Sequence, residues 1–147
     1  MTMPSPVMSF QVEVIDSPSA EDRSDLIKIY NDAPQRILDT LTPEQLVDHL
    51  LSARGYTLYA ARYNGRLLGA AVLHPWTKGL RMRYLVVRKV SRRKGVAIEL
   101  LNHVIALADM PIYIDMPQNT ATDLLFDKAG FTKLNAEEGR AFWRLDV

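Results

Sequence analysis

The dipeptide Asn64-Gly65, between two strand-like runs near the middle of the chain, places the strongest constraint on the fold. Residues 57–73, TLYAARYNGRLLGAAVL, carry apolar and β-branched or aromatic residues on both sides of it. Asn-Gly is the pair best able to supply the positive φ angles of a tight hairpin turn. The sequence therefore predicts an antiparallel pair of strands here.

Further strand patterns surround this pair. Residues 80–87, LRMRYLVV, predict a third adjacent strand, reached through a loop from Pro75 to Gly79. Alternation at Met8, Phe10, Val12 and Val14 predicts an N-terminal strand, and residues 1–7 are expected to be a loose tail. IYIDM predicts a short buried strand and AFWRLDV a last strand, while FTKLN is a candidate for one more.

Four segments have helix signals. The first, SPSAEDRSDLIKIY, offers Ser17 or Ser19 as its cap. TPEQLVDHLL combines a capping Thr42 with Pro43 and a capping-box Gln45. VAIELLNHVIALADM has an apolar face, and NTATDLLFDKAGF is expected to end at Gly130. The order β-α-α-β-β-β-α-β-α-β predicts one domain over residues 1–147, of class α/β (α+β mixed), with helices on the faces of a mixed sheet.

Charge is distributed unevenly along the chain. The formal net charge is +1, but no Asp or Glu occurs between Asp48 and Glu99, and basic residues gather between Arg81 and Lys94. Absence of cysteine excludes disulfides, thiolate metal sites and a cysteine nucleophile, and no spacing of His, Asp and Glu indicates another metal site. The N-terminus lacks the pattern of a signal peptide, and no apolar run is long enough to cross a bilayer. We expect a cytoplasmic protein with no membrane partner.

The segment VVRKVSRRKGVA, residues 86–97, leads from a strand through a basic loop into a helix. Main-chain N–H groups and the helix dipole at such a point attract anions. Gly95 and Ala97 leave room for phosphate oxygens, and Arg92, Arg93 and Lys94 can neutralise their charge. The segment therefore suits a pyrophosphate, although an ordinary solvated helix start is the alternative. The spacing matches neither a P-loop nor G-x-G-x-x-G.

Two motifs resemble signatures of the GNAT acetyltransferase superfamily. LVVRKVSRRKGVA resembles the acetyl-CoA-binding signature of the superfamily, Q/R-x-x-G-x-G/A, which reads Arg92-x-x-Gly95-x-Ala97 here. NTATDLLFDKAGF resembles a second signature of the superfamily, an asparagine followed by a helix that ends in x-K-x-G-F. The resemblance implies a mostly antiparallel sheet of six or seven strands, flanked by about four helices and splayed after the fourth strand. It also implies that acetyl-CoA or CoA is bound by Leu85, Val86, Val87, Arg92, Arg93, Lys94, Gly95, Val96, Ala97, Asn119 and Phe126.

The sequence offers few groups for acetyl transfer. In many superfamily members a tyrosine protonates the leaving thiolate, but the matching position here is Phe126. Residues 49–98 contain no carboxylate to act as base. His74 and Tyr84 are the remaining catalytic candidates, and each has an ordinary packing role as its alternative. Whether the protein is an enzyme is left open.

Three stretches, DLIKIYNDAP, YAARYNGRLLGAAVL and VRKVSRRKGVA, resemble the PanZ (PanM) family of acetyl-CoA sensors. Members bind aspartate α-decarboxylase, promote self-cleavage of the pro-enzyme and restrain the mature enzyme as CoA feedback on pantothenate synthesis. The resemblance implies that Asn64 and Arg92 lie on the docking surface. The capped helix between Gln35 and Arg54 departs from shorter sensors, which have little there.

Three functions follow as hypotheses. The first is a cofactor-loaded regulator of this sensor type. The second is an N-acetyltransferase acting on an amine of a small molecule or protein, with water or His74 as base. The third, a nucleic-acid-binding module, is disfavoured because the chain outside the basic loop is not basic.

Overall fold

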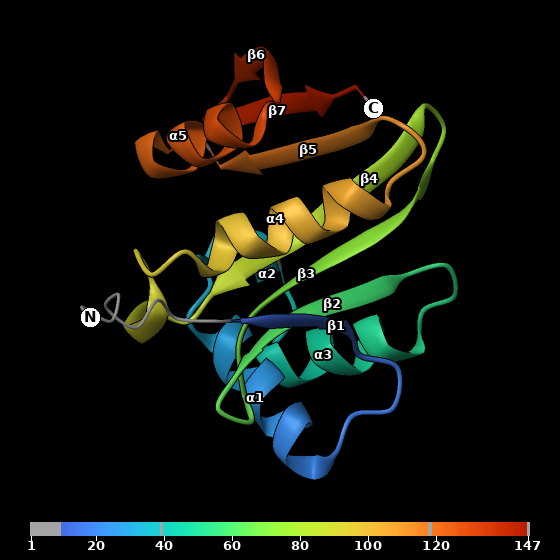
Figure 1. Cartoon of the computed structure of the whole chain (residues 1–147), viewed down its shortest axis with the longest axis vertical. Coiled ribbons are helices and arrows are strands. Elements are labelled where there is room, and N and C mark those ends of the chain that lie inside the picture. The colour runs from blue at the N-terminus through green and yellow to red at the C-terminus, as the bar shows by residue number, and fades with distance from the viewer. Residues whose placement is uncertain (1–9, 39, 118, 147) are drawn as a thin grey trace, which may run out of the picture.

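The computed structural model describes residues 10–38, 40–117 and 119–146, and its core is a seven-stranded sheet in the order β1-β2-β3-β4-β5-β7-β6 (Figure 1). The strands are β1 (Gln11–Val14), β2 (Thr57–Tyr63), β3 (Arg66–Trp76), β4 (Gly79–Val87), β5 (Ile112–Pro117), β6 (Thr132–Glu137) and β7 (Arg140–Leu145). The helices are α1 (Ala20–Asn31), α2 (Gln35–Leu38), α3 (Pro43–Ser52), α4 (Val96–Leu107) and α5 (Thr120–Ala129), with a 3₁₀ turn, η1 (Lys89–Ser91). No helix in these ranges is long and apolar enough to span a bilayer.

Most local predictions are confirmed. Asn64 and Gly65 have φ angles of 49° and 79° and join β2 to β3 as an antiparallel hairpin. Ser19, rather than Ser17, caps α1, and Thr42 and Gln45 form the predicted capping box of α3. Beyond these, α5 ends at Gly130, and β6 confirms the candidate strand at FTKLN. The described part of the N-terminal strand begins at Gln11, so the predicted start at Met8 and the tail at 1–7 lie outside the described residues.

The predicted loop from Pro75 to Gly79 is shorter in the structure, where Thr77 and Lys78 form the turn. Strand β3 extends to Trp76, and β4 begins at Gly79, which pairs with it. The pairing of β2 with β3 ends at Leu73, so Pro75 lies where β3 borders β4 alone, and a proline without an N–H is tolerated at such an edge. The short helix α2 and the turn η1 were not predicted.

Helices cover both faces of the sheet and create two cores. On one face, α4 and α5 bury Leu100, Leu101 and Phe126 against the sheet. On the other face, α1 and α3 bury Leu26 and Leu46, among others. Residues of β2 alternate between the two cores, as expected for a strand covered on both sides.

The sheet opens between β4 and β5. These strands are parallel and pair at three positions, ending at Met82 and Ile114, while β4 continues to Val87. Figure 1 shows the two strands close together at one end and diverging at the other, with β5, β6, β7 and α5 on one side of the opening. The structure thus has the predicted splay after the fourth strand, in a mixed, mostly antiparallel sheet.

Candidate functional site

A bulge in β4 accompanies the splay. The register between β3 and β4 shifts between Ala70 and Val72, opposite Tyr84, whose φ of 56° lies in the left-handed region. This conformation is costly for a residue with a side chain. The hydroxyl of the fully buried Tyr30 on α1 donates a hydrogen bond of 2.9 Å to the Tyr84 carbonyl oxygen. Burial, with a smaller contribution from Tyr84, raises the pKa of Tyr30, so this hydroxyl remains a proton donor.

The loop between β4 and α4 contains two residues in the left-handed region. Arg93 and Gly95 both have left-handed φ angles, 65° and 86°, and residues 92–95 are exposed. A turn that contains left-handed residues can direct neighbouring N–H groups to one side, and this favours anions. A Cβ added to Gly95 would have Ile98 Cγ2, at 4.0 Å, as its nearest neighbour, so the space over the glycine is open.

Helix α4 begins without a side-chain cap within the described part of the chain. Its N-cap is Gly95, whereas α1, α3 and α5 are capped by Ser19, Thr42 and Asn119 respectively. The first N–H groups of a helix have no acceptor inside the helix. Together with the positive end of the helix dipole, these N–H groups of α4 can bind an anion.

The C-terminal end of α1 holds this loop in place. The Asp32 carboxylate accepts hydrogen bonds from Arg88 Nε at 2.9 Å and from the Lys89 N–H at 3.0 Å. Burial works to raise the pKa of Asp32, but these hydrogen bonds and the charge of Arg88 outweigh it and lower the pKa. The exposed Arg92 donates to the carbonyl oxygens of Asp32, at 3.1 Å, and Val87, at 3.3 Å. The guanidinium of Arg92 is therefore partly engaged in fixing the loop.

Gly69 allows α4 to start close to the sheet. A Cβ at this position of β3 would lie 3.0 Å from Val96 Cγ1 and 3.2 Å from the Val86 carbonyl oxygen. Val96 is the first residue of α4 and is buried. Because glycine has no Cβ, Gly69 allows the N-terminus of α4 to lie this close to β3.

The other residues predicted to bind the cofactor differ in position. Leu85 and Val86 are buried on opposite faces of β4. Asn119 caps α5, its Oδ1 accepting from the Ala121 N–H at 2.7 Å. Phe126 is fully buried, with ring centroids 5.5 Å from those of Phe131 and Trp143. Direct contact of these residues with a cofactor stays a prediction.

A cavity of about 360 Å³ adjoins the splay. Its walls come from α2 and the segment after it, from β4 and β5 around the point where their pairing ends, and from the start of β7. Tyr84 lies in this lining, with its ring edge-on to Tyr30 at a centroid separation of 6.4 Å. Of the two catalytic candidates, the structure thus places Tyr84 at the cavity.

His74 is not among the described residues that line this cavity. Its ring stacks on Tyr56 at 4.8 Å, and its Nδ1 lies 2.8 Å from the Pro75 carbonyl oxygen. Its Nε2 is buried with no hydrogen-bond acceptor or donor among the described residues. The described contacts of His74 are therefore those of a packing residue.

Asp115 on β5 is a site residue that sequence reasoning missed. Its carboxylate lies 2.7 Å from Arg81 on β4 and 3.3 Å from Arg140 on β7. Burial works to raise the pKa of Asp115, but the hydrogen bond from Arg81 and the charges of both arginines outweigh it and lower the pKa. Asp115 is therefore a weak base. A polar residue inside the apolar run IYIDM was the available signal.

The proposed docking residues Asn64 and Arg92 are both exposed at one end of the sheet. Gly69 pairs with Val87, and the Arg88 N–H donates to the Leu68 carbonyl oxygen at 2.8 Å. These contacts bring the tip of the β2–β3 hairpin to the end of the molecule that holds the basic loop (Figure 1).

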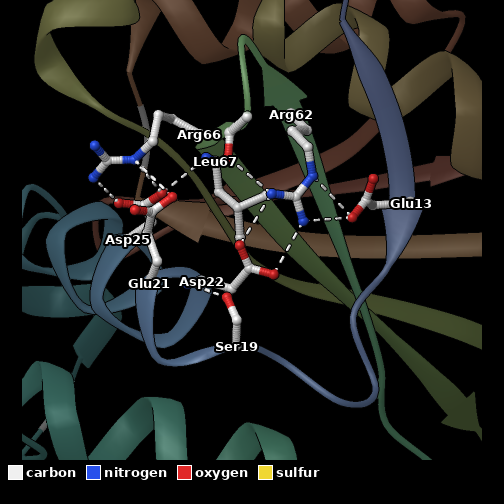
Figure 2. Close-up of polar contacts among 9 residues, drawn as sticks. Glu13, Ser19, Glu21, Asp22, Asp25, Arg62, Arg66 and Leu67 are labelled. Carbon is white, nitrogen blue, oxygen red and sulfur yellow. Dashed lines mark hydrogen bonds and ion pairs between the residues drawn. The ribbon is translucent and has the colours of Figure 1, made fainter.

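Two arginines fix the hairpin to its surroundings (Figure 2). Arg62 donates to Glu13 Oε1 at 2.6 Å, to both carboxylate oxygens of Asp22 and to the Gly65 carbonyl oxygen. The buried Asp25 accepts from Arg66 Nε at 2.9 Å and from the Leu67 N–H at 3.1 Å. The turn that carries Asn64 is consequently attached to both β1 and α1.

Comparison with known proteins identifies one family and one fold. A family model described as "Acetyltransferase (GNAT) domain, PanZ" matches residues 9–116. A protein named "PanD regulatory factor" from Salmonella typhimurium strain LT2 is 38% identical over 88 residues, which are 59% of each chain. The chain therefore covers less than two thirds of that relative.

Solved structures share the fold at low sequence identity. The GNAT domain of S. lividans PAT has a TM-score of 0.74 at 18% identity, covering 94% of this chain and 90% of that one. The PaiA N-acetyltransferase of Thermoplasma acidophilum, solved in complex with coenzyme A, has a TM-score of 0.72 at 14% identity, covering 93% and 99%. The ribosomal-protein-S18-alanine N-acetyltransferase of Escherichia coli has a TM-score of 0.72 at 13% identity, covering 95% and 94%.

Proposed function

Because this chain belongs to the PanZ family of GNAT acetyltransferase domains, we propose that it is a regulator of aspartate α-decarboxylase that binds acetyl-CoA or CoA. In this proposal it promotes self-cleavage of the pro-enzyme and restrains the mature enzyme when the cofactor is abundant. The observation that carries the proposal is the uncapped start of α4 beside the open end of β4.

The residues present fit the proposed cofactor. The N–H groups at the start of α4 are available to the pyrophosphate, and the space over Gly95 lets its oxygens approach the main chain. Arg93 and Lys94 are exposed beside them and supply positive charge. Main-chain groups of Leu85 and the Val87 N–H, beyond the last β4–β5 pair, are available to a pantetheine arm.

The position of the docking residues supports a link between cofactor and partner. Asn64 and Arg92 share one end of the sheet with the basic loop. Arg92 also contacts the carbonyl oxygen of Val87 on β4. A decarboxylase bound across the hairpin and this loop would therefore contact the region that holds the pyrophosphate.

Regulation is favoured over catalysis by the chemistry of the site. Phe126 has no proton to donate, and the carboxylate at the cavity, Asp115, has a lowered pKa. His74 lies outside the described lining of the cavity. These features support binding of acetyl-CoA without efficient transfer.

The test combines the purified full chain with the unprocessed aspartate decarboxylase of the same source, with and without acetyl-CoA. We expect co-elution and faster chain cleavage when acetyl-CoA is present. Absence of a complex under both conditions would contradict the proposal.

A matched pair of glycine variants tests the cofactor site. Gly95→Glu adds a negative charge where phosphate is proposed to bind, and should weaken acetyl-CoA binding in calorimetry at least tenfold. Gly55→Glu is the control, because Gly55 also has a left-handed φ, 81°, and has room for a side chain. Equal affinity of both variants for acetyl-CoA would exclude the proposed pyrophosphate site at the start of α4.

Acetyl transfer to an amine is the second candidate function, favoured by the presence of Tyr84 at the cavity. A screen of amine acceptors that follows release of CoA tests it. Turnover at ordinary enzyme rates that is abolished by Tyr84→Phe would support this function, whereas loss of turnover in His74→Gln would indicate the histidine as base.

A further inference from the structure

The described lining of the cavity at the splay is strongly cationic. Four arginines line it, from α2, β4 and β7, and the carboxylate in the described lining is that of Asp115. Asp115 is shared by Arg81 and Arg140, so it balances one of their two charges. The described lining therefore carries three more positive than negative charges.

Two of these guanidinium groups have donors left for a ligand as far as the described residues show. Within the described ranges, no carboxylate lies at ion-pair distance from Arg36 or Arg83. The guanidinium carbon of Arg83 lies 4.8 Å from the centre of the Tyr84 ring, which holds the side chain at the cavity. Arg36 extends from α2 towards the β6–β7 turn, with one terminal nitrogen 3.3 Å from the position a Cβ at Gly139 would take.

The remaining walls are apolar. Leu38 and Leu41 contribute from the side of α2, and Ile114 contributes from β5. A volume of about 360 Å³ is near the lower end of the range for small-molecule sites. The cavity thus suits a short carbon skeleton that carries negative charge, and disfavours a cationic ligand such as a polyamine.

This cavity is distinct from the proposed pyrophosphate site. None of residues 88–97 belongs to its described lining, which meets the cofactor region at Tyr84 and Leu85. The arginines of the cavity are therefore not needed to explain binding of the cofactor's phosphates.

We propose that this arginine-lined cavity is a second ligand site, which binds a small carboxylate-bearing molecule. A guanidinium pairs with a carboxylate through two parallel hydrogen bonds, and the apolar wall covers the carbon chain. The proposal goes beyond decarboxylase regulation and does not depend on it, since all the residues involved belong to this chain.

The test is calorimetric titration of the full chain with four probes: succinate, the neutral succinamide, the cation putrescine and inorganic phosphate. We expect succinate to bind at least tenfold more tightly than each of the others, because it alone combines carboxylates with a carbon chain. The proposal would be overturned if succinate did not bind. It would also be overturned if succinamide or putrescine bound as tightly as succinate. Tighter phosphate binding would overturn the assignment to carboxylates.

Charge-matched variants locate the site. Arg83→Gln and Arg36→Gln should each weaken succinate binding about tenfold. Arg54→Gln, at an exposed position outside the cavity lining, should leave it unchanged. The melting temperature of each variant verifies that it is folded. Because Arg36 is exposed, Arg36→Gln still tests the site if Arg83→Gln does not fold. Acetyl-CoA affinity measured in parallel separates failure of this site from failure of the cofactor site. Unchanged succinate binding in both cavity variants would place the ligand elsewhere and overturn the proposal.

Discussion

Tyr84 is held in an unfavourable conformation at the point where the two halves of the sheet separate. A left-handed φ at a non-glycine residue costs roughly 1 kcal/mol or more. The hydrogen bond from Tyr30 satisfies its carbonyl oxygen, and Tyr30 is fixed by complete burial in the core between α1 and the sheet. A single hydroxyl on α1 therefore stabilises the bulge at the candidate site.

Replacement of Tyr30 by Phe should reduce the free energy of unfolding by about 1 kcal/mol, because the carbonyl oxygen of Tyr84 loses its donor while the ring packing is kept. Urea unfolding followed by circular dichroism measures this. Tyr63→Phe is the control, since Tyr63 lies next to the hairpin turn and its ring packs against Phe10. Equal losses in the two variants would indicate that the Tyr30 hydroxyl has no special role.

At the scale of elements, α1 connects three parts of the site. Asp25 binds the Leu67 N–H beside the hairpin, Tyr30 binds the bulge, and Asp32, the C-cap, binds the loop before α4. All three residues lie in DLIKIYNDAP, one of the stretches that resembles the PanZ family. The physical role of this stretch is to fix the positions of strand, bulge and loop relative to one another.

Removal of the Asp32 carboxylate tests this connection. Asp32→Ala should lower the free energy of unfolding by about 2 kcal/mol, because Arg88 and the Lys89 N–H lose a largely buried acceptor. It should also weaken acetyl-CoA binding, because the loop is no longer fixed. Asp48→Ala is the matched control, since its ion pair with Arg23 is exposed and contributes little. A stability loss in Asp48→Ala as large as in Asp32→Ala would refute the expected difference.

Elements determined by local chemistry could be predicted, and contacts between distant elements could not. The Asn64-Gly65 turn, the Thr42 capping box and the stop at Gly130 each depend on a few adjacent residues. The bulge at Tyr84 depends on the register of β4 against β3. The position of Asp115 between arginines of β4 and β7 depends on the order of strands across the sheet.

For the molecule as a whole, carboxylates with lowered pKa values connect the separate parts. For Asp22 the leading cause is the hydrogen bond from Arg62. For Asp25 burial opposes the shift, and the hydrogen bonds from Arg66 and the Leu67 N–H outweigh it. Burial also opposes the shift at Asp32 and Asp115: hydrogen bonds from the Lys89 N–H and Arg88 lower the pKa of Asp32, and Arg81 and Arg140 lower that of Asp115. These four residues attach α1 to the hairpin, α1 to the basic loop, and β5 to its neighbours.

The folded protein should therefore become less stable as the pH falls. Because these carboxyls have lower pKa values in the folded protein than in the unfolded chain, their contribution is complete above the ordinary aspartate pKa and is lost as the pH falls through the folded values. We expect a sharp decrease in melting temperature below about pH 4. Calorimetric scans from pH 3 to pH 7 measure this, and a melting temperature unchanged on acidification below pH 4 would contradict it.

The uncapped start of α4 also has a consequence for hydrogen exchange. Capping side chains protect in part the amide protons at the start of α1, α3 and α5, whereas among the described residues no side-chain cap protects those of Val96, Ala97 and Ile98. Exchange at these three amides should be fast in the free protein and slow when an anion occupies the turn. Their exchange rates would therefore report occupancy of the turn directly, amide by amide, in the purified protein.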